Sequence, residues 1–275
     1  MKKYELISNT ITEANRGLYQ IKALRDIGDF VKAGDLGGYI ESEKNLSHDG
    51  NCWVDRDAQV YENALVCDNA YVGDFATVRN NAKVCNNARV EGCASICDNA
   101  YVGDNVHVYN CAQLFGNSKA LNNVRLYNNA VMCDDSVACD NTIVCNNALL
   151  RDNAKICGWA QITGNSKIYD NAIVSGNAQI LNDARIYGNA KIYGNAVVFG
   201  NALVFDDAQV YQNANVSGTS KIYGRGKVYG RASVYEEAAV FDDAKVCENA
   251  IIGSNVQLSG NAIAVYSLLP QKKNL

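Results

Sequence analysis

Cysteine and histidine are the residue types in this chain with the widest range of chemistry. The 275 residues include 11 cysteines and two histidines, His48 and His107. Structural zinc sites often use paired CxxC segments, and the sequence contains none. A nucleophilic serine or cysteine needs a neighbouring base, and no Ser-His-Asp or Cys-His arrangement is legible. These residues predict no metal centre, and they leave open whether the chain is an enzyme.

The charge and the hydropathy of the sequence argue against two classes of partner, nucleic acid and membranes. A net charge of −4 is too small to predict binding to nucleic acid or to an anionic membrane. The N-terminal residues MKKYELISNT lack an apolar export segment, and no apolar run approaches the length of a membrane span. We therefore expect a soluble, cytoplasmic protein with reduced thiols and with no membrane or nucleic-acid partner.

The elements that position these side chains come from a six-residue repeat. Every sixth residue from Val54 to Ala264, 36 positions in all, is Val, Ile, Leu, Met or Ala. The residues two positions earlier, from Cys52 to Ala262, are small or Val and never charged. Two inward residues separated by one outward residue are typical of a β-strand.

The repeat predicts a solenoid rather than hairpins, because every strand presents the same face in the same phase. A strand of about four residues and a two-residue corner account for each repeat, and three sides close a triangular coil of about 18 residues. About 12 such coils fit the chain. Gly, Asp and Asn suit the corners because they tolerate the left-handed α conformation, and stacked asparagines can form hydrogen-bonded ladders.

The pattern aliphatic-x-x-x-small-x over residues 52–265 resembles the hexapeptide repeat of left-handed parallel β-helices, the trimeric acyltransferase-like superfamily. The segment LYQIKALRDIGDFVKAGDLGGYIESEKNLSHDGNCWV resembles the uncharacterised YdcK family of bacterial and prophage genomes. The fold class is therefore all-β, a parallel β-helix solenoid, and its left-handedness is implied by the resemblance alone. The resemblance also implies a homo-oligomer, a trimer or a dimer.

Three segments follow from where the repeat holds. Residues 1–48 are predicted to form a small N-terminal β cap, 49–265 the hexapeptide-repeat β-helix, and 266–275 a C-terminal tail. In the cap, YELISNTITE and GLYQIKALRD are predicted strands and GDLGG a turn. Ile40 and Leu46 are expected to begin the first, imperfect coil.

An 18-residue coil stacks aromatic side chains on one outward face of the helix, and it stacks Tyr193, Tyr211 and Tyr229 on another. We interpret this as stacking that stabilises the sheet, and the alternative is a protein-binding surface. The first of these sets is Tyr169, Tyr187, Phe205, Tyr223 and Phe241.

Cysteines share this outward class, and the pairs Cys67/Cys85 and Cys139/Cys157 are predicted to stack on adjacent coils, about 4.8 Å apart. We interpret them as small β-favouring residues. One coil also places apolar side chains outward on all three faces, which favours burial in an oligomer. Its aliphatic members are Val131, Val137, Ile143 and Leu149.

Aspartates line one predicted corner on consecutive coils. Asp134, Asp152 and Asp170 are interpreted as solvated turn residues, and the alternative is a weak ladder of divalent-cation sites.

The resemblance implies that an acyltransferase of this superfamily would use a histidine as general base and acetyl-CoA as cofactor. His107 is the one histidine in the coils, whereas His48 lies in the cap segment NLSHDGN and suits a turn or cap hydrogen bond. No loop interrupts the repeat to shape a site. We therefore predict a non-catalytic rigid scaffold or protein-binding module that self-associates and needs no cofactor. The alternatives are an acyltransferase with His107 as base, and a phage-linked inhibitor that occludes a host protein.

Overall fold

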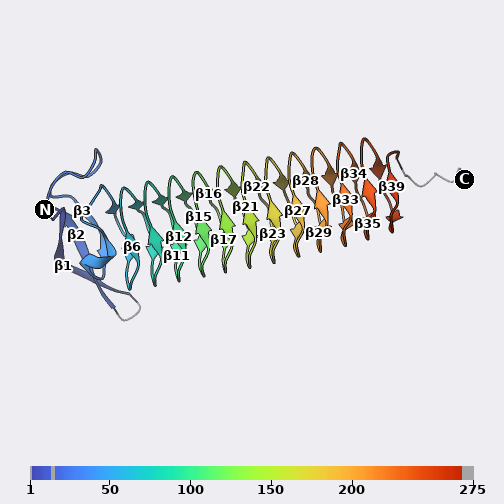
Figure 1. Ribbon diagram of the computed structural model, residues 1–275. Helices are drawn as coiled ribbons and strands as arrows, with labels where there is room; N and C mark the ends of the chain where they lie inside the picture. The colour runs from blue at the N-terminus through green and yellow to red at the C-terminus, as the bar shows by residue number, and fades with distance from the viewer. Residues whose placement is uncertain (1, 14–15, 268–275) are drawn as a thin grey trace, which may run out of the picture. The chain divides into compact units, whose positions relative to one another are not determined.

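The computed structural model describes residues 2–13 and 16–267. The chain divides into two compact units, Met1–Asp135 and Ser136–Leu275. The predicted boundary at residues 48/49 falls inside the first unit, and the predicted tail lies almost wholly outside the described residues. In both units the repeat runs through short strands joined by tight corners (Figure 1). No helix among the described residues is long and apolar enough to span a membrane.

The cap of the first unit is an antiparallel hairpin that leads into the solenoid. Strand β1 (Tyr4–Glu13) pairs with β2 (Arg16–Ala23), and β2 pairs with β3 (Leu36–Ile40). Strand β3 then pairs in parallel with β5 (Gln59–Val60), with Ile40 opposite Val60. After the short 3-10 helix η1 (Glu43–Asn45), Leu46 bridges Val66 in parallel. Ile40 and Leu46 therefore begin the first coil, as predicted.

The turn predicted at GDLGG, residues 34–38, is wrong in its second half. Gly34 has a φ of +97° and turns the chain, but Leu36 to Gly38 belong to strand β3. A Cβ on Gly37 would lie 2.5 Å from the carbonyl oxygen of Val54, and one on Gly38 would lie 2.6 Å from that of Ala58. These glycines let the strand approach the first coil closely, and they are not needed for a turn.

In the first unit, the repeat strands fall into three parallel sheets. One continues the cap sheet beyond β3 with β5 (Gln59–Val60), β8 (Thr77–Val78), β11 (Ser95–Ile96), β14 (Gln113–Leu114) and β17 (Val131–Met132). The second contains β4 (Trp53–Val54), β7 (Tyr71–Val72), β10 (Arg89–Val90), β13 (His107–Val108) and β16 (Arg125–Leu126). The third contains β6 (Leu65–Val66), β9 (Lys83–Val84), β12 (Tyr101–Val102) and β15 (Lys119–Ala120).

The second unit has the same three-sheet arrangement. One sheet contains β20 (Leu149–Leu150), β23 (Lys167–Ile168), β26 (Arg185–Ile186), β29 (Leu203–Val204), β32 (Lys221–Ile222), β35 (Ala239–Val240) and β38 (Gln257–Leu258). Another contains β19 (Ile143–Val144), β22 (Gln161–Ile162), β25 (Gln179–Ile180), β28 (Val197–Val198), β31 (Asn215–Val216), β34 (Ser233–Val234) and β37 (Ile251–Ile252). The third contains β18 (Val137–Ala138), β21 (Lys155–Ile156), β24 (Ile173–Val174), β27 (Lys191–Ile192), β30 (Gln209–Val210), β33 (Lys227–Val228), β36 (Lys245–Val246) and β39 (Ile263–Ala264).

The core of each coil is the predicted pair of inward positions. Val198 and Ala196 are both fully buried, and Val198 lies opposite Ile180 of the neighbouring coil. The strands are two residues long rather than the predicted four, because the chain turns on both sides of each pair. The hydrogen bonding nevertheless continues past the strand, since the Phe199 N–H donates to the Val216 carbonyl at 2.9 Å. The left-handed winding stays a prediction.

The corners divide two tasks between adjacent residues. The first corner residue takes the left-handed α conformation, as Asp68 does with a φ of 58°. The second carries the predicted asparagine ladder: Asn63 Nδ2 donates to Asn81 Oδ1 at 3.1 Å, and Asn81 donates in the same way to Asn99 at 3.1 Å. Each ladder ties successive coils together along the axis.

Candidate functional site

The polar groups around His107 gather on the outer face of the sheet β4-β7-β10-β13-β16 in the first unit. The register places His107 opposite Arg89, and Arg89 opposite Tyr71, on neighbouring parallel strands. Asp55 and Glu91 lie just after β4 and β10 on the same side. The 18-residue coil thus brings together five side chains that span 53 residues of sequence.

His107 and Glu91 form the central pair of this face. His107 Nε2 lies 2.6 Å from Glu91 Oε2, and the Arg89 guanidinium donates to Glu91 Oε1 at 2.6 Å. Burial alone would raise the pKa of Glu91, but the hydrogen bonds from Arg89 and His107 outweigh it and hold this pKa below its usual value. Glu91 is therefore an anion that fixes the orientation of the imidazole.

Tyr71 extends the same network toward the cap. Its ring covers Gly73, where a Cβ would lie 2.6 Å from the ring, and its hydroxyl donates to Asp55 Oδ2 at 2.7 Å. The Arg89 guanidinium lies 4.7 Å from the ring centroid. Burial and the hydrogen bond to Asp55 raise the pKa of Tyr71 well above its ordinary range, so the hydroxyl stays protonated.

The cap supplies one wall beside this network. Phe30 contacts the Tyr71 ring edge-on, with 5.9 Å between the centroids. A shallow cavity of about 370 Å³ lies here, lined by Phe30, Val31, Asp35, Leu36, Asp55, Tyr71 and Arg89. His107 is not part of the lining, and its side chain is 38% exposed. The arrangement offers an oriented base on an open face, which is the geometry of a general base without an enclosing site.

The predicted aromatic stacking in the second unit is confirmed. The rings of Tyr169, Tyr187, Phe205, Tyr223 and Phe241 follow one another with centroids 4.8–5.1 Å apart and planes within 2–3° of parallel. We call these five residues the aromatic ladder. The guanidinium of Arg151 covers the first ring at 4.8 Å. A second stack joins Tyr193, Tyr211 and Tyr229.

The aliphatic girdle predicted for an oligomer interface lies at outward strand positions. Val131 belongs to the first unit, and Val137, Ile143 and Leu149 belong to the second. All four are half-buried within the chain. Their role in an oligomer stays a prediction.

The corner aspartates act as turn residues. Asp152 Oδ2 accepts the Asp170 N–H at 3.2 Å, and Asp170 Oδ2 accepts the Gly188 N–H at 2.9 Å. Asp134 has the same left-handed backbone, with a φ of 57°. The carboxylates of Asp152 and Asp170 therefore each accept a backbone hydrogen bond from the next coil. The alternative, a ladder of divalent-cation sites, stays a prediction.

The two predicted thiol pairs lie on adjacent coils, and each pair is joined by a carboxylate that the sequence did not predict. The ligand atoms of Cys67, Asp68 and Cys85 lie within 4.8 Å of one another, and those of Cys139, Asp140 and Cys157 do the same. Burial, with Asp140 and Cys157, raises the pKa of Cys139 to about 11. The 18-residue spacing predicts the thiol pairs, but the added carboxylate follows only from the corner geometry.

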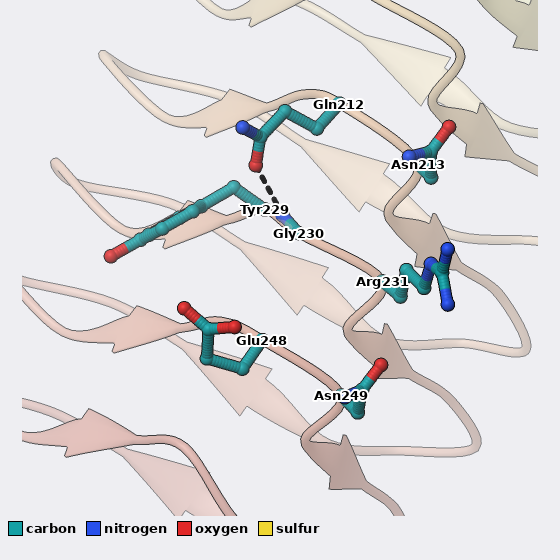
Figure 2. Close-up of a pocket in the computed structure, with 7 residues that line it drawn as sticks. All are labelled: Gln212, Asn213, Tyr229, Gly230, Arg231, Glu248 and Asn249. Carbon is teal, nitrogen blue, oxygen red and sulfur yellow. Dashed lines mark hydrogen bonds between the residues drawn. The ribbon is translucent and has the colours of Figure 1, made fainter.

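A hollow of about 450 Å³ in the second unit gathers no catalytic set. Figure 2 shows Gln212 bonded to the Gly230 N–H, while Tyr229 extends away from Arg231. The Gln212 Oε1 accepts this bond at 2.7 Å, and Glu248 and Arg231 do not point toward one another (Figure 2). A hydrogen bond with Cys247 raises the pKa of Tyr229 to about 12.

With the fold in place, comparison with known proteins supports the resemblance of the repeat. The family "YdcK Beta solenoid repeat" matches residues 166–182 and 184–198. The repeat resembles that of YdcK. The "Uncharacterized acetyltransferase YdcK" of Escherichia coli (strain K12) is 39% identical to this chain over 59 residues. The match covers 21% of this chain and 18% of YdcK, so it spans about a fifth of each.

Proposed function

We propose that this YdcK-like chain is a non-catalytic binding module that docks a protein partner along the aromatic ladder. The observation that supports this is the orientation of the rings. Because the five rings stack face to face, their faces are occupied by one another, and the half-exposed ladder presents ring edges to solvent. A sugar or a nucleobase needs a free ring face for stacking, whereas a protein surface can pack against edges and tyrosine hydroxyls.

The ladder is also rigid, since each ring sits on a coil that is hydrogen-bonded to its neighbours. The Tyr187 N–H donates to the Val204 carbonyl, and the Phe205 N–H to the Ile222 carbonyl, both at 3.0 Å. A preformed strip loses little conformational entropy when a partner docks. Self-association through the aliphatic girdle is part of the same proposal, and it would present several ladders at once.

The test places a photo-reactive phenylalanine analogue at a single position. At Phe205 we expect it to cross-link a discrete partner protein in cells, and at Tyr211, in the other aromatic stack, we expect no such product. The double change Tyr187→Ser and Tyr223→Ser should abolish that cross-link, while Tyr193→Ser and Tyr211→Ser should retain it. Equal cross-linking from both stacks would contradict docking on the ladder.

An acyltransferase is the second candidate, and the Glu91–His107 pair is the observation that favours it. The YdcK relative is named an uncharacterised acetyltransferase, and an oriented histidine suits a general base. If the chain is an enzyme, His107→Ala should lower its rate by about 10²–10⁴-fold. The binding proposal instead expects no saturable acetyl-CoA complex by calorimetry. An inhibitor that occludes a host protein would use the same ladder, and it differs in that docking abolishes the partner's activity.

A further inference from the structure

The two thiol clusters use positions that belong neither to the network around His107 nor to the aromatic ladder, and two thiolates with a carboxylate are ligands that zinc accepts. Each cluster brings two cysteine sulfurs and one carboxylate oxygen within 4.8 Å of one another. We propose that each unit binds one divalent cation of the zinc class, through Cys67, Asp68 and Cys85 in the first and through Cys139, Asp140 and Cys157 in the second.

Parallel register brings the two sulfurs of each cluster together. Cys67 follows β6 and Cys85 follows β9, and these strands pair with Val66 opposite Val84. The Cys67 N–H then donates to the Val84 carbonyl at 3.0 Å, so the ladder continues to the cysteines. Two equivalent residues on neighbouring parallel strands project to the same side.

The second cluster repeats this geometry. Strands β18 and β21 pair with Ala138 opposite Ile156, and the Cys139 N–H donates to the Ile156 carbonyl at 2.9 Å. Cys157 therefore lies beside Cys139 just as Cys85 lies beside Cys67. The same donor set thus recurs in both units.

The corner backbone supplies the carboxylate. Asp68 has a φ of 58°, its Oδ2 accepts the Asn86 N–H at 2.9 Å, and the Cys67 sulfur lies 3.6 Å from that oxygen. Asp140 has a φ of 62°, and its Oδ2 accepts the Gly158 N–H at 2.8 Å. The turn therefore holds a carboxylate next to the first thiol in both clusters.

The donor set favours a bridging cation over a disulfide. Neighbouring strands lie about 4.8 Å apart, a separation that a disulfide also tolerates, but a disulfide would join the two sulfurs alone, whereas a cation would also engage the carboxylate. Two zinc–sulfur bonds of about 2.3 Å that meet at a tetrahedral angle need sulfurs about 3.8 Å apart, and rotation about the Cα–Cβ bonds can bring the two sulfurs to that separation without backbone movement. Thiolate ligands also select zinc-like ions over Mg²⁺ or Ca²⁺.

Binding of the ion releases protons and leaves a small net charge on the site. A divalent cation replaces the protons of two thiols and joins one carboxylate, so two protons go to solvent and the complex carries one negative charge. A lysine precedes the second cysteine by two residues in each cluster, Lys83 before Cys85 and Lys155 before Cys157. Each lysine occupies the outward position of its strand and can offset that charge.

The experiment titrates the reduced, metal-free full chain with Cd²⁺ and follows thiolate-to-cadmium charge-transfer absorption. We expect two ions per chain, displaced by Zn²⁺ in excess. The variants Cys67→Ser/Cys85→Ser and Cys139→Ser/Cys157→Ser should each bind one ion, and the fourfold variant none. Serine already occupies the equivalent outward position in the next coil at Ser175, so these substitutions suit the fold.

Two further variants complete the test. Cys93→Ser/Cys111→Ser removes two exposed cysteines and should still bind two ions. Asp68→Asn, with the second cluster removed, should keep one site but weaken its Kd by at least about tenfold, the effect of losing even an outer-shell partner. A folded wild-type chain that binds no Cd²⁺, or a fourfold variant that still binds two ions, would overturn the proposal. A Cys67–Cys85 disulfide that forms in air without any Cd²⁺ binding by the reduced chain would overturn it as well.

Discussion

At the residue scale, the face around His107 depends on the ionised form of Glu91. The Arg89 guanidinium and the His107 ring both bind this carboxylate, and His107 gains a fixed orientation from it. Glu91 differs from an ordinary surface acid because protonation of its carboxylate would weaken the contacts with both Arg89 and His107 at once. The network is therefore sensitive to acid.

The pH dependence of stability tests this coupling. The pKa of Glu91 is depressed in the folded chain, so its contribution is present above the unfolded value of 4.5 and is lost as the pH falls through the lower folded value. We expect Glu91→Gln to lower the melting temperature at pH 7, and this difference from wild type to vanish in the acid range. Glu237→Gln, at an exposed acid, is the control and should show no such trend. A constant Glu91→Gln deficit from pH 7 to pH 3 would contradict the assignment.

At the element scale, each strand is two residues long and depends on its neighbours in the stack. Val197 and Val198 form one strand, yet only Val198 points inward and is fully buried. The hydrophobic pattern fixes which residue faces in, because a slip of one residue would move the apolar set from the core to the outer face.

A pair of adjacent substitutions measures this inward phase. Val198→Asp would bury an unpaired charge between coils and should lower the free energy of unfolding by at least about 4 kcal/mol. Val197→Asp changes a half-buried outward side chain and should cost less than about 1 kcal/mol. Chemical denaturation monitored by circular dichroism gives both values, and equal losses would mean that the assigned phase is wrong.

At the scale of the whole molecule, function has to come from outward surfaces, because the described inward positions hold aliphatic and small side chains. The aromatic ladder, the network around His107 and the thiol clusters each use outward positions or corners. Repetition gives every surface a regular spacing, so each can be altered without disturbing the core.

The oligomer prediction belongs to this scale. Val137→Lys and Ile143→Lys place charges at half-buried outward positions of the girdle, and should lower the mass measured by light scattering at micromolar concentration. The β-rich circular dichroism should survive. Thr77→Lys, at a half-buried outward position elsewhere, is the control and should keep the oligomer. A monomeric wild-type chain would refute self-association directly.

The repeat in the sequence is enough to predict the solenoid, the inward phase, the first coil at Ile40 and the stacking from Tyr169 to Phe241. A period of six and a coil of 18 residues fix which side chains align, so spacing alone carries that information. It also marked His107 as the histidine of the coils. The turn predicted for the second half of GDLGG was wrong. Gly37 is required because the backbone of Val54 leaves no room for a Cβ, and the local sequence does not reveal that contact.

Tertiary structure decided which outward groups touch one another. Glu91 meets His107 because the imidazole reaches back across one coil, and Tyr71 reaches Asp55 because Gly73 leaves room for its ring. The carboxylate of Asp68 meets the Cys67 sulfur through a left-handed corner. Periodicity assigns a residue to a column, but rotamers and corner dihedrals determine where its terminal atoms lie. The chemistry of this chain depends on those atoms.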